Sequence, residues 1–230
     1  MKNTEISWCD HTFNPWTGCA KVSPGCANCY AESWAKRSGI VKWGGPRRRT
    51  SASNWNEPRK WDREAQAALA AHSDECAKDM SYGQHVKPPA RPRVFCASLA
   101  DWLDDAVPVE WLADLLALIR ATPHLDWLLL TKRIGNAKSM LPADWGDGYP
   151  NVWLGATVVN QAEADRDVPK LLAVPARVRF LSIEPMLGPV DLGRFLLRCC
   201  GHLVPGNDHG VYGTEPPQCC GQPEPSFDLD

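Results

Sequence analysis

The hydrophobic positions of this chain fall into short runs that alternate with helical patterns. Four apolar runs are bounded by turn-forming residues and are too short for helices, which predicts buried β-strands at residues 94–97, 127–130, 152–154 and 178–183. Between these runs, apolar residues recur at helical spacing and predict helices at residues 109–121, 134–140 and 161–173. Strands and helices that alternate in this way form βαβ units. We therefore predict an α/β fold around a parallel sheet, either open or curled toward a barrel.

The first part of the chain is less regular. Residues 5–8 are predicted to form a short first strand, and residues 27–37 a helix. The loop between them contains residues 14–18, which are predicted to brace it, and a direct role in ligand binding is the alternative. Residues 38–92 are polar and form an excursion from the core, with a predicted helix at residues 61–78. The basic residues of this excursion are either a solvated face or phosphate contacts, namely Arg47, Arg48, Arg49, Arg59 and Lys60.

Polar residues follow each of the four later strands. In parallel α/β folds the carboxyl ends of the strands carry ligands, because loops from several strands converge there. The candidate binding residues at these positions are Ser98, Asp101, Thr131, Lys132, Thr157, Asn160 and Glu184. Each also has a structural alternative: Asp101 can cap the next turn, Lys132 can be solvated, and Glu184 can form a structural salt bridge. Because Glu184 precedes Pro185 at a chain reversal, its carboxylate is expected to face this edge of the sheet.

Three cysteines, Cys19, Cys26 and Cys29, lie within eleven residues of the chain. Their spacing is C-x6-C-x2-C, and Pro24 and Gly25 hold the loop between them. Three converging thiolates favour a cubane iron-sulfur cluster with one open iron, because structural zinc normally takes four protein ligands. We therefore predict a metal site at this loop, on the same edge of the sheet as the polar strand ends.

Two other interpretations of the cysteine loop remain open at this point. Cys9 or His11 could supply a fourth ligand, which would favour zinc instead of an iron-sulfur cluster. Alternatively, the three cysteines are unligated structural thiols, since free cysteine often serves as a small buried hydrophobic residue.

Composition places the chain among ordinary soluble proteins. Hydrophobic residues make up 44% and charged residues 23% of the 230 positions, enough to bury one large α/β domain or two small ones. The net charge of −2 argues against a protein that coats nucleic acid nonspecifically. No apolar run is long enough to span a membrane, and the first ten residues do not resemble a signal peptide. We expect a cytoplasmic protein without a membrane partner, in which the ten cysteines are metal ligands or reactive thiols.

The end of the chain changes character after Asp191. Paired cysteines flank a segment rich in glycine, proline and histidine, at Cys199, Cys200, Cys219 and Cys220. This pattern suggests a second metal site, with zinc held by tetrahedral thiolate ligands. We therefore divide the chain into an α/β domain at residues 1–195 and a cysteine-rich, zinc-binding or truncated segment at residues 196–230.

Six blocks of the sequence resemble, in order, a phage and prophage family with a three-cysteine motif whose members are described as radical-SAM-like. They lie at residues 14–19, 22–32, 94–101, 128–133, 153–158 and 179–191. The resemblance implies a partial triosephosphate-isomerase-type barrel with a [4Fe-4S] cluster held by Cys19, Cys26 and Cys29. It also implies S-adenosylmethionine as cofactor, bound at the open iron and by the polar strand ends, with Lys132 and Glu184 placed to meet its charged groups.

The activity that this resemblance implies is the reductive cleavage of S-adenosylmethionine to a 5′-deoxyadenosyl radical, which abstracts a hydrogen atom from the substrate. Such an enzyme needs an electron donor. The phage resemblance and the basic excursion suggest a nucleic acid or nucleotide substrate. The alternative is a noncatalytic, zinc-dependent nucleic-acid-binding protein that uses both groups of cysteines as structural sites.

Overall fold

The computed structural model describes residues 1–78, 86–195, 198–199 and 202–203 of the chain. It divides into two compact units, Met1–Val190 and Asp191–Asp230. The described elements of the second unit are a 3₁₀-helix at Gly193–Phe195 and the short antiparallel strands β8 (Arg198–Cys199) and β9 (His202–Leu203). The strands and helices described below, with the candidate site, belong to the first unit.

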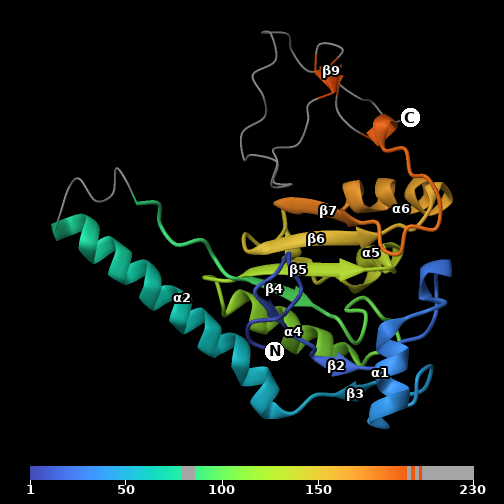
Figure 1. Cartoon of the computed structure of the whole chain (residues 1–230), viewed down its shortest axis with the longest axis horizontal. Helices are drawn as coiled ribbons and strands as arrows, with labels where there is room; N and C mark the ends of the chain where they lie inside the picture. Colours follow the sequence, from blue (N-terminus) through green and yellow to red (C-terminus); the bar gives the residue numbers. More distant parts are fainter. Residues whose placement is uncertain (79–85, 196–197, 200–201, 204–230) are drawn as a thin grey trace. The chain divides into compact units, whose positions relative to one another are not determined.

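A five-stranded parallel sheet forms the centre of the first unit (Figure 1). Its strands are β1 (His11–Thr12), β4 (Arg93–Cys96), β5 (Asp126–Thr131), β6 (Val152–Thr157) and β7 (Val178–Ser182). Each strand pairs with the next of these along the chain, in the order β1-β4-β5-β6-β7. The predicted α/β fold with a parallel sheet is confirmed. Within the described residues the sheet does not close into a barrel, because β1 and β7 are its two outermost strands.

The first strand lies later in the chain than the sequence predicted. Residues 5–8 form turns, and β1 (His11–Thr12) pairs with β4 through His11 opposite Val94 and Thr12 opposite Phe95. The Asp10 amide donates a hydrogen bond to the Arg93 carbonyl oxygen at 2.9 Å, which sets this register. The prediction failed because Trp8, one of the apolar residues that suggested a strand, instead packs its ring against Phe95, with 4.7 Å between ring centroids.

The helices follow the predicted segments, with one large difference at a boundary. They are α1 (Tyr30–Ser38), α2 (Ala52–Lys78), α4 (Val109–Arg120), α5 (Ala137–Met140) and α6 (Gln161–Ala173), and 3₁₀-helices lie at Pro24–Cys26, Ile134–Asn136 and Ala143–Trp145. Helix α2 begins nine residues before the predicted start at residue 61 and contains Pro58 in its interior. Figure 1 shows α2 as a long helix that extends away from the sheet.

Two contacts anchor the first half of α2 to the rest of the unit. Trp61 is 1% exposed and stacks on His11, with 4.4 Å between ring centroids. The Asp62 carboxylate accepts a hydrogen bond from the His124 amide at 2.7 Å. These contacts stabilise the first part of the helix, which the polar sequence before residue 61 did not indicate. Most of the second half of α2 is exposed.

The main hydrophobic core lies on one face of the sheet. Alternate strand residues such as Val94, Trp127 and Leu154 point into it, where they are joined by Leu115 and Ile119 of α4. The other face carries the intervening residues, which in register across the sheet include Phe95, Leu128, Leu130, Trp153 and Phe180. Alternation of side chains along each strand therefore gives both faces apolar residues, as expected for strands of a parallel sheet.

One position in the sheet requires glycine. A Cβ atom at Gly155 would lie 2.3 Å from the Cζ atom of Phe180, whose ring covers this part of the neighbouring strand. Gly155→Ala is expected to lower the free energy of unfolding by about 1 to 3 kcal/mol, because the ring has to move out of its packed position. Equilibrium urea unfolding followed by tryptophan fluorescence measures the change.

Two further variants control this prediction. In Gly135→Ala the nearest neighbour of the new Cβ is the Lys170 Nζ atom at 3.7 Å, an ordinary van der Waals distance, so this variant is expected to leave stability nearly unchanged. In Gly155→Ala/Phe180→Ala the clash is absent, so the double variant should lose less than the sum of the two single variants. Strict additivity would contradict the proposed clash.

Candidate functional site

The structure brings several of the predicted binding residues together at the carboxyl ends of the strands. Asp101, which follows β4, is 5% exposed and accepts a hydrogen bond from the Thr131 hydroxyl at 2.6 Å. Its other carboxylate oxygen accepts from the Lys132 amide at 2.9 Å. Asp101 also accepts from the Leu103 amide at 3.0 Å, which is the turn-capping role considered from the sequence. Asp101 thus joins the loop after β4 to the end of β5.

Lys132 and Thr157 connect the next pair of strands. The Lys132 ammonium donates a hydrogen bond to the Thr157 hydroxyl at 3.4 Å. Thr157, the last residue of β6, is 2% exposed. Lys132 forms no ion pair with any residue that the structure describes, so its charge remains available to an anionic ligand.

Arg133 links this network to the cysteine loop. Its guanidinium group donates a hydrogen bond to the Cys19 sulfur at 3.3 Å and another to the Ala20 carbonyl oxygen at 2.9 Å. It also lies 3.4 Å from the Asp101 carboxylate, and the side chain is only 8% exposed. Burial alone would lower the pKa of Arg133, but Asp101, Cys19 and Asp104 raise it further than burial lowers it. The guanidinium group is therefore a fixed positive charge beside the first cysteine.

A second buried arginine completes the charge balance. Arg47 donates to the Asp104 carboxylate at 2.7 Å, and the two side chains are 5% and 1% exposed. Asp104 also lies 3.9 Å from the Arg133 guanidinium group. The buried cluster thus contains the cations Arg47 and Arg133 and the anions Asp101 and Asp104, which pair with one another.

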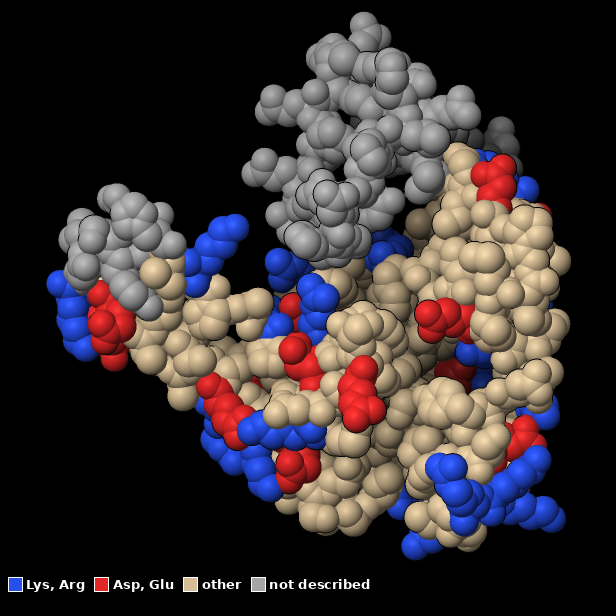
Figure 2. All heavy atoms as spheres, in the orientation of Figure 1, with Lys and Arg blue, Asp and Glu red and all other residues tan. Residues whose placement is uncertain are grey.

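The other arginines of the basic run also make contacts within the chain. Arg48 donates to the Ile40 carbonyl oxygen at 3.1 Å, and Arg49 pairs with Asp114 at 2.7 Å while lying 4.2 Å from the centre of the Trp55 ring. Figure 2 shows acidic and basic side chains mixed along α2, and basic ones gathered over α1, whose last turn carries Lys36 and Arg37. The basic run therefore serves structural contacts, and phosphate contact by it stays a prediction.

Ser98 lies at a junction of three segments. Its hydroxyl accepts a hydrogen bond from the Asn14 side-chain amide at 3.0 Å, and its carbonyl oxygen accepts one from the Tyr30 hydroxyl. The Asn14 side-chain oxygen accepts from the Leu99 amide at 2.7 Å. Asn14 thus braces the loop after β1 against the loop after β4, as predicted.

The last two candidate binding residues differ in their surroundings. Asn160 caps the start of α6, where its side-chain oxygen accepts from the Glu163 amide at 3.0 Å. The Glu163 carboxylate in turn accepts from the Val159 amide at 3.1 Å, so the two side chains together satisfy backbone donors before and at the helix start. Glu184 is exposed after β7 and makes no hydrogen bond or ion pair with the described part of the chain.

The cysteine loop lies against the carboxyl ends of β6 and β7. Within it, Ser23 caps the 3₁₀-helix Pro24–Cys26 by accepting a hydrogen bond from the Gly25 amide at 3.0 Å. A Cβ atom at Gly25 would lie 2.6 Å from Val159 and 3.3 Å from Pro185. Only glycine permits this close approach. The predicted placement of the loop at this edge is confirmed by these contacts and by the Arg133 hydrogen bonds.

Cys19, Cys26 and Cys29 are free thiols. Cys26 is buried, whereas Cys19 and Cys29 are half-buried. Burial raises the pKa of Cys19, and the neighbouring Arg133 opposes part of that increase. Among the described residues, no group of three His, Cys, Asp or Glu side chains converges as a set of metal ligands. The three thiols are of the chemical type that a cluster requires and lie on one loop with a cation beside the first of them, and their convergence on a cluster stays a prediction.

The two candidate fourth ligands lie at the other end of the sheet from the cysteine loop. Cys9 precedes β1 and is buried, which raises the pKa of its thiol to about 11. His11 begins β1, and its Nδ1 atom accepts a hydrogen bond from the Asn3 amide at 3.2 Å. Cys9 and His11 lie at the amino ends of the parallel strands, whereas the cysteine loop lies at the carboxyl ends. Their positions therefore do not support zinc ligation by either residue together with the loop.

The second predicted metal site lies almost entirely outside the described residues. Cys199 is part of β8, and Cys200, Cys219 and Cys220 fall in the segments that the structure leaves undescribed. The zinc prediction for these four cysteines therefore stays a prediction.

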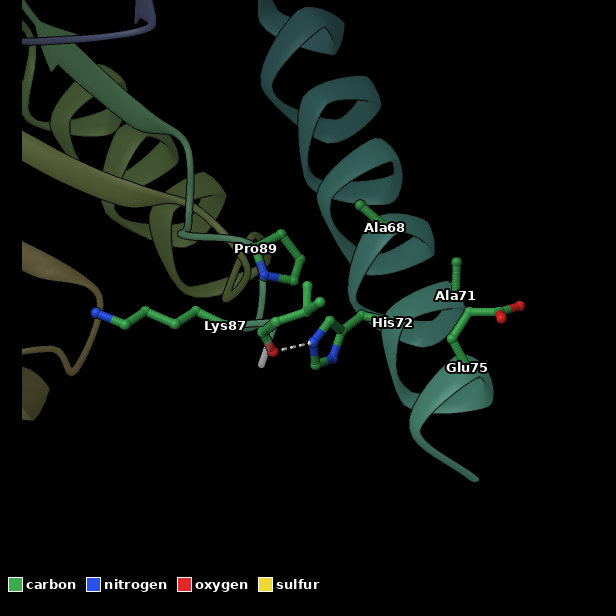
Figure 3. A pocket seen from close by; sticks show the side chains of 7 residues that line it. Ala68, Ala71, His72, Glu75, Lys87 and Pro89 are labelled. Atoms are coloured by element: carbon green, nitrogen blue, oxygen red, sulfur yellow. Dashed lines mark hydrogen bonds between the residues drawn. The ribbon is translucent and has the colours of Figure 1, made fainter. Parts of the chain in front are cut away.

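Two hollows of similar size open on the first unit. One, of about 360 Å³, lies between the second half of α2 and residues 86–89, where His72 is hydrogen-bonded to the Val86 carbonyl oxygen at 3.0 Å (Figure 3). The other, of about 310 Å³, is lined by residues of the cysteine loop, of the loops after β4 and β5, and of α6, including Val22, Asp105 and Lys132. Only the second is lined by a predicted binding residue, Lys132, and it also borders the cysteine loop, so it is the better candidate for a ligand site.

Acidic and basic residues of α6 meet at the second hollow. Asp167 accepts hydrogen bonds from Arg166 and from Lys170, the latter at 3.0 Å. Burial alone would raise the pKa of Asp167, but these hydrogen bonds and charges hold it below its ordinary value. In the unfolded chain the pKa of this carboxyl is about 3.9, and in the folded protein it is lower. The ionised carboxylate therefore stabilises the fold at pH values above about 3.9, and this contribution is lost as the pH falls through the pKa of the folded protein.

The lowered pKa of Asp167 predicts a pH dependence of stability that can be measured. Wild-type protein is expected to be more stable than the Asp167→Asn variant at pH 6, and the difference should shrink as the pH falls below about 4. Urea unfolding of both proteins across this pH range measures the difference. A difference that stays constant down to pH 3 would contradict the assignment to ionised Asp167.

Three residues at this edge were missed as site candidates in the sequence, namely Asp104, Arg133 and Arg166, and Arg47 was considered only as part of the basic run. Arg133 directly follows Lys132 at a strand end, and that position was the available signal. For Arg133, as for Lys132, exposure to solvent was the structural alternative that the sequence left open. The partner Asp104 and the distant Arg47 carry no local pattern that indicates their pairing.

Comparison with known proteins places the chain in a family without assigning it an activity. A family model described as protein of unknown function, DUF5131, matches residues 3–215, and the chain therefore belongs to that family. Searches of curated proteins and of solved structures give no match. No helix in the described residues is long and apolar enough to cross a membrane.

Proposed function

We propose that this member of a family of unknown function is an iron-sulfur enzyme of the radical-SAM type. The observation that carries the proposal is the position of the cysteine loop. Three free thiols lie on one loop, which packs on the carboxyl ends of parallel strands through Gly25. In parallel α/β folds, this edge holds cofactors and reacting groups.

Two further features support this function. The strands follow one another in chain order, without the reversal that divides a doubly wound sheet, and this order is that of five consecutive strands of a (β/α)₈ barrel. In addition, the buried Arg133 guanidinium group donates a hydrogen bond to the Cys19 sulfur, a contact that favours a thiolate ligand. We therefore propose that the first unit is a partial barrel of the radical-SAM kind.

In this proposal Cys19, Cys26 and Cys29 hold a [4Fe-4S] cluster, and S-adenosylmethionine binds beside it. When bound and reduced by an electron donor, the two cofactors supply a 5′-deoxyadenosyl radical for hydrogen abstraction. The chain's own residues bind and orient the reactants. Lys132 and Glu184 offer charges to S-adenosylmethionine, while Ser98, Asp101, Thr131, Thr157 and Asn160 shape the surrounding loops through the hydrogen bonds described above.

The competing function is a noncatalytic, zinc-dependent nucleic-acid-binding protein. That function requires a fourth ligand at the cysteine loop, and Cys9 and His11 lie at the opposite edge of the sheet. It also requires several exposed cations on the basic run, but only Arg48 of the three consecutive arginines is exposed without a carboxylate partner among the described residues, since Arg47 is buried and Arg49 is paired with Asp114. Both observations favour the iron-sulfur enzyme.

The deciding experiment is anaerobic reconstitution of the full chain with iron and sulfide. Metal analysis and electron paramagnetic resonance of the reduced protein are then recorded with and without S-adenosylmethionine. We expect a four-iron signal that shifts when S-adenosylmethionine is added, because the cofactor binds the open iron. Stoichiometric zinc at the loop, without such a signal, would overturn the proposal.

A further inference from the structure

We infer that the hollow beside the cysteine loop binds a phosphate ester group of the substrate. The inference rests on the proposed function for its link to catalysis, but the binding itself is independent of any cofactor. It would make the substrate a phosphorylated molecule, of which a nucleotide or a nucleic acid is the form expected from the sequence.

The lining of this hollow is predominantly cationic. Its volume of about 310 Å³ lies at the lower end of the range for ligand pockets. Four cations and two carboxylates line it together with Val22, Gly135 and Asn136; the charged residues are Lys132, Arg133, Arg166, Lys170, Asp105 and Asp167. A phosphate ester has several oxygens and up to two negative charges, so it can engage several cations at once.

The cations and the carboxylate of α6 lie at different depths. The Arg166 and Lys170 side chains are 50% and 44% exposed, whereas the Asp167 side chain between them is 6% exposed. Asp167 accepts hydrogen bonds from both, at 3.0 Å from Arg166 Nε and 3.0 Å from Lys170 Nζ. Arg166 also lies 3.5 Å from the Glu163 carboxylate, whose side chain is 4% exposed. Buried carboxylates therefore hold the two cations in place while both remain open to solvent, which pre-organises them for an anion.

The loop after β5 adds a third available cation to the lining. Lys132 has a hydroxyl partner, Thr157, and no carboxylate partner among the described residues. Arg133 contributes a fourth positive charge, although Asp101 and Asp104 neutralise much of it. Cations from the loop after β5 and cations from α6 thus line the same hollow.

The position of the hollow connects the phosphate to the proposed chemistry. Val22, which lines it, stands between Cys19 and Cys26 in the chain, and Arg133 both lines it and donates to the Cys19 sulfur. A phosphate held there would anchor the substrate beside the cysteine loop. Binding energy from such a remote group is what orients a substrate for reaction.

The test uses the full chain without added metal and four probes: thymidine 5′-phosphate, thymidine, inorganic phosphate, and an oligonucleotide of eight thymidines without a terminal phosphate. Isothermal titration at low salt is expected to show binding of thymidine 5′-phosphate at least about tenfold tighter than thymidine. Competition by inorganic phosphate indicates a terminal monoester as the ligand, whereas tighter binding of the oligonucleotide indicates a phosphodiester. Equal affinity for thymidine and both phosphorylated probes would overturn the inference.

Variants locate the binding. Lys170→Gln is expected to weaken phosphate binding by about tenfold, and Lys170→Arg to retain most of it, because a charged hydrogen bond is worth roughly that factor. Lys78→Gln removes an exposed lysine on α2, whose side chain is 70% exposed, and should leave binding unchanged. Thermal unfolding of each variant checks that the fold is intact. Phosphate binding that is unaffected by Lys170→Gln in a folded protein would overturn the inference.

Failure of this inference and failure of the proposed function give different results. If the reconstituted protein shows the S-adenosylmethionine-dependent signal but binds the phosphorylated probes no more tightly than thymidine, the phosphate inference is wrong and the proposed function stands. If phosphate binds at the Lys170 site but the loop takes up no iron-sulfur cluster, the proposed function is wrong and the binding site stands.

Discussion

The Cys29→Ala variant is expected to bind no iron-sulfur cluster after anaerobic reconstitution, and Cys19→Ala and Cys26→Ala are expected to behave in the same way. A cubane cluster with an open iron has three protein ligands, so losing any one of them leaves two irons without a thiolate. Iron content should fall from about four atoms per chain to well under one. Metal analysis, visible absorbance and electron paramagnetic resonance measure the loss.

Cys76 supplies the matched control for these variants. It is a free, half-buried thiol on α2, and its sulfur lies 3.7 Å from His72 Nδ1, away from the cysteine loop. Cys76→Ala should therefore retain the full cluster. Equal loss of iron from Cys76→Ala and Cys29→Ala would show that the iron is bound nonspecifically and would remove the cluster assignment.

Cys9 distinguishes the iron-sulfur site from the zinc site. If Cys9 were a fourth ligand, Cys9→Ala would release metal from the loop. Its position before β1, at the edge opposite the loop, predicts instead that Cys9→Ala keeps the cluster. Reconstituted Cys9→Ala and Cys19→Ala, compared side by side, separate a three-ligand site from a four-ligand site.

The central sheet could be predicted from the sequence because its determinants are local. The run at residues 127–130 is apolar on both faces of the strand and is bounded by turn residues, and the structure places it in β5 (Asp126–Thr131). Helix α6 (Gln161–Ala173) was predicted to the residue from the helical spacing of its apolar residues, and in the structure Asn160 caps its start. In such segments the pattern and the tertiary structure favour the same element.

Other features were missed because they depend on contacts between distant parts of the chain. The early start of α2 depends on Trp61 packing against His11, and no local propensity in the polar segment before it indicates a helix with an internal proline. The buried pair Arg47–Asp104 joins residues 57 positions apart, and Arg47 in the sequence is one of three consecutive arginines. A charge run gives no sign of which member will be buried.

At the candidate site the sequence predicted the location better than the roles of individual residues. Strand ends and the cysteine loop do meet at one edge, as the α/β pattern required. The residue that connects them, however, is Arg133, whose side chain reaches both Asp101 and Cys19. Removing the Arg133 side chain is therefore expected to have a large effect on stability.

Arg133→Met is expected to lower the free energy of unfolding by about 3 to 5 kcal/mol, because it removes one partner of a buried ion pair. Asp101, at 5% exposure, would lose its nearest cation and keep only hydrogen bonds from Thr131, Lys132 and Leu103. Asp104 would still pair with Arg47, which places the expected loss toward the lower end of this range. For a chain of this size, the loss corresponds to a fall in melting temperature of roughly 6 to 20 °C.

Two comparisons separate the buried pair from a general effect of removing a charge. Lys2→Met breaks the exposed pair Lys2–Glu64, whose side chains are 49% and 57% exposed, and should change stability by less than about 1 kcal/mol. Arg133→Met/Asp101→Asn removes both charges of the pair, so it should be less destabilised than Arg133→Met alone. If Arg133→Met unfolds no earlier than Lys2→Met, the guanidinium group is not a stabilising element of this edge. In that case the charge network would be a binding surface, and the loss should appear in ligand affinity instead.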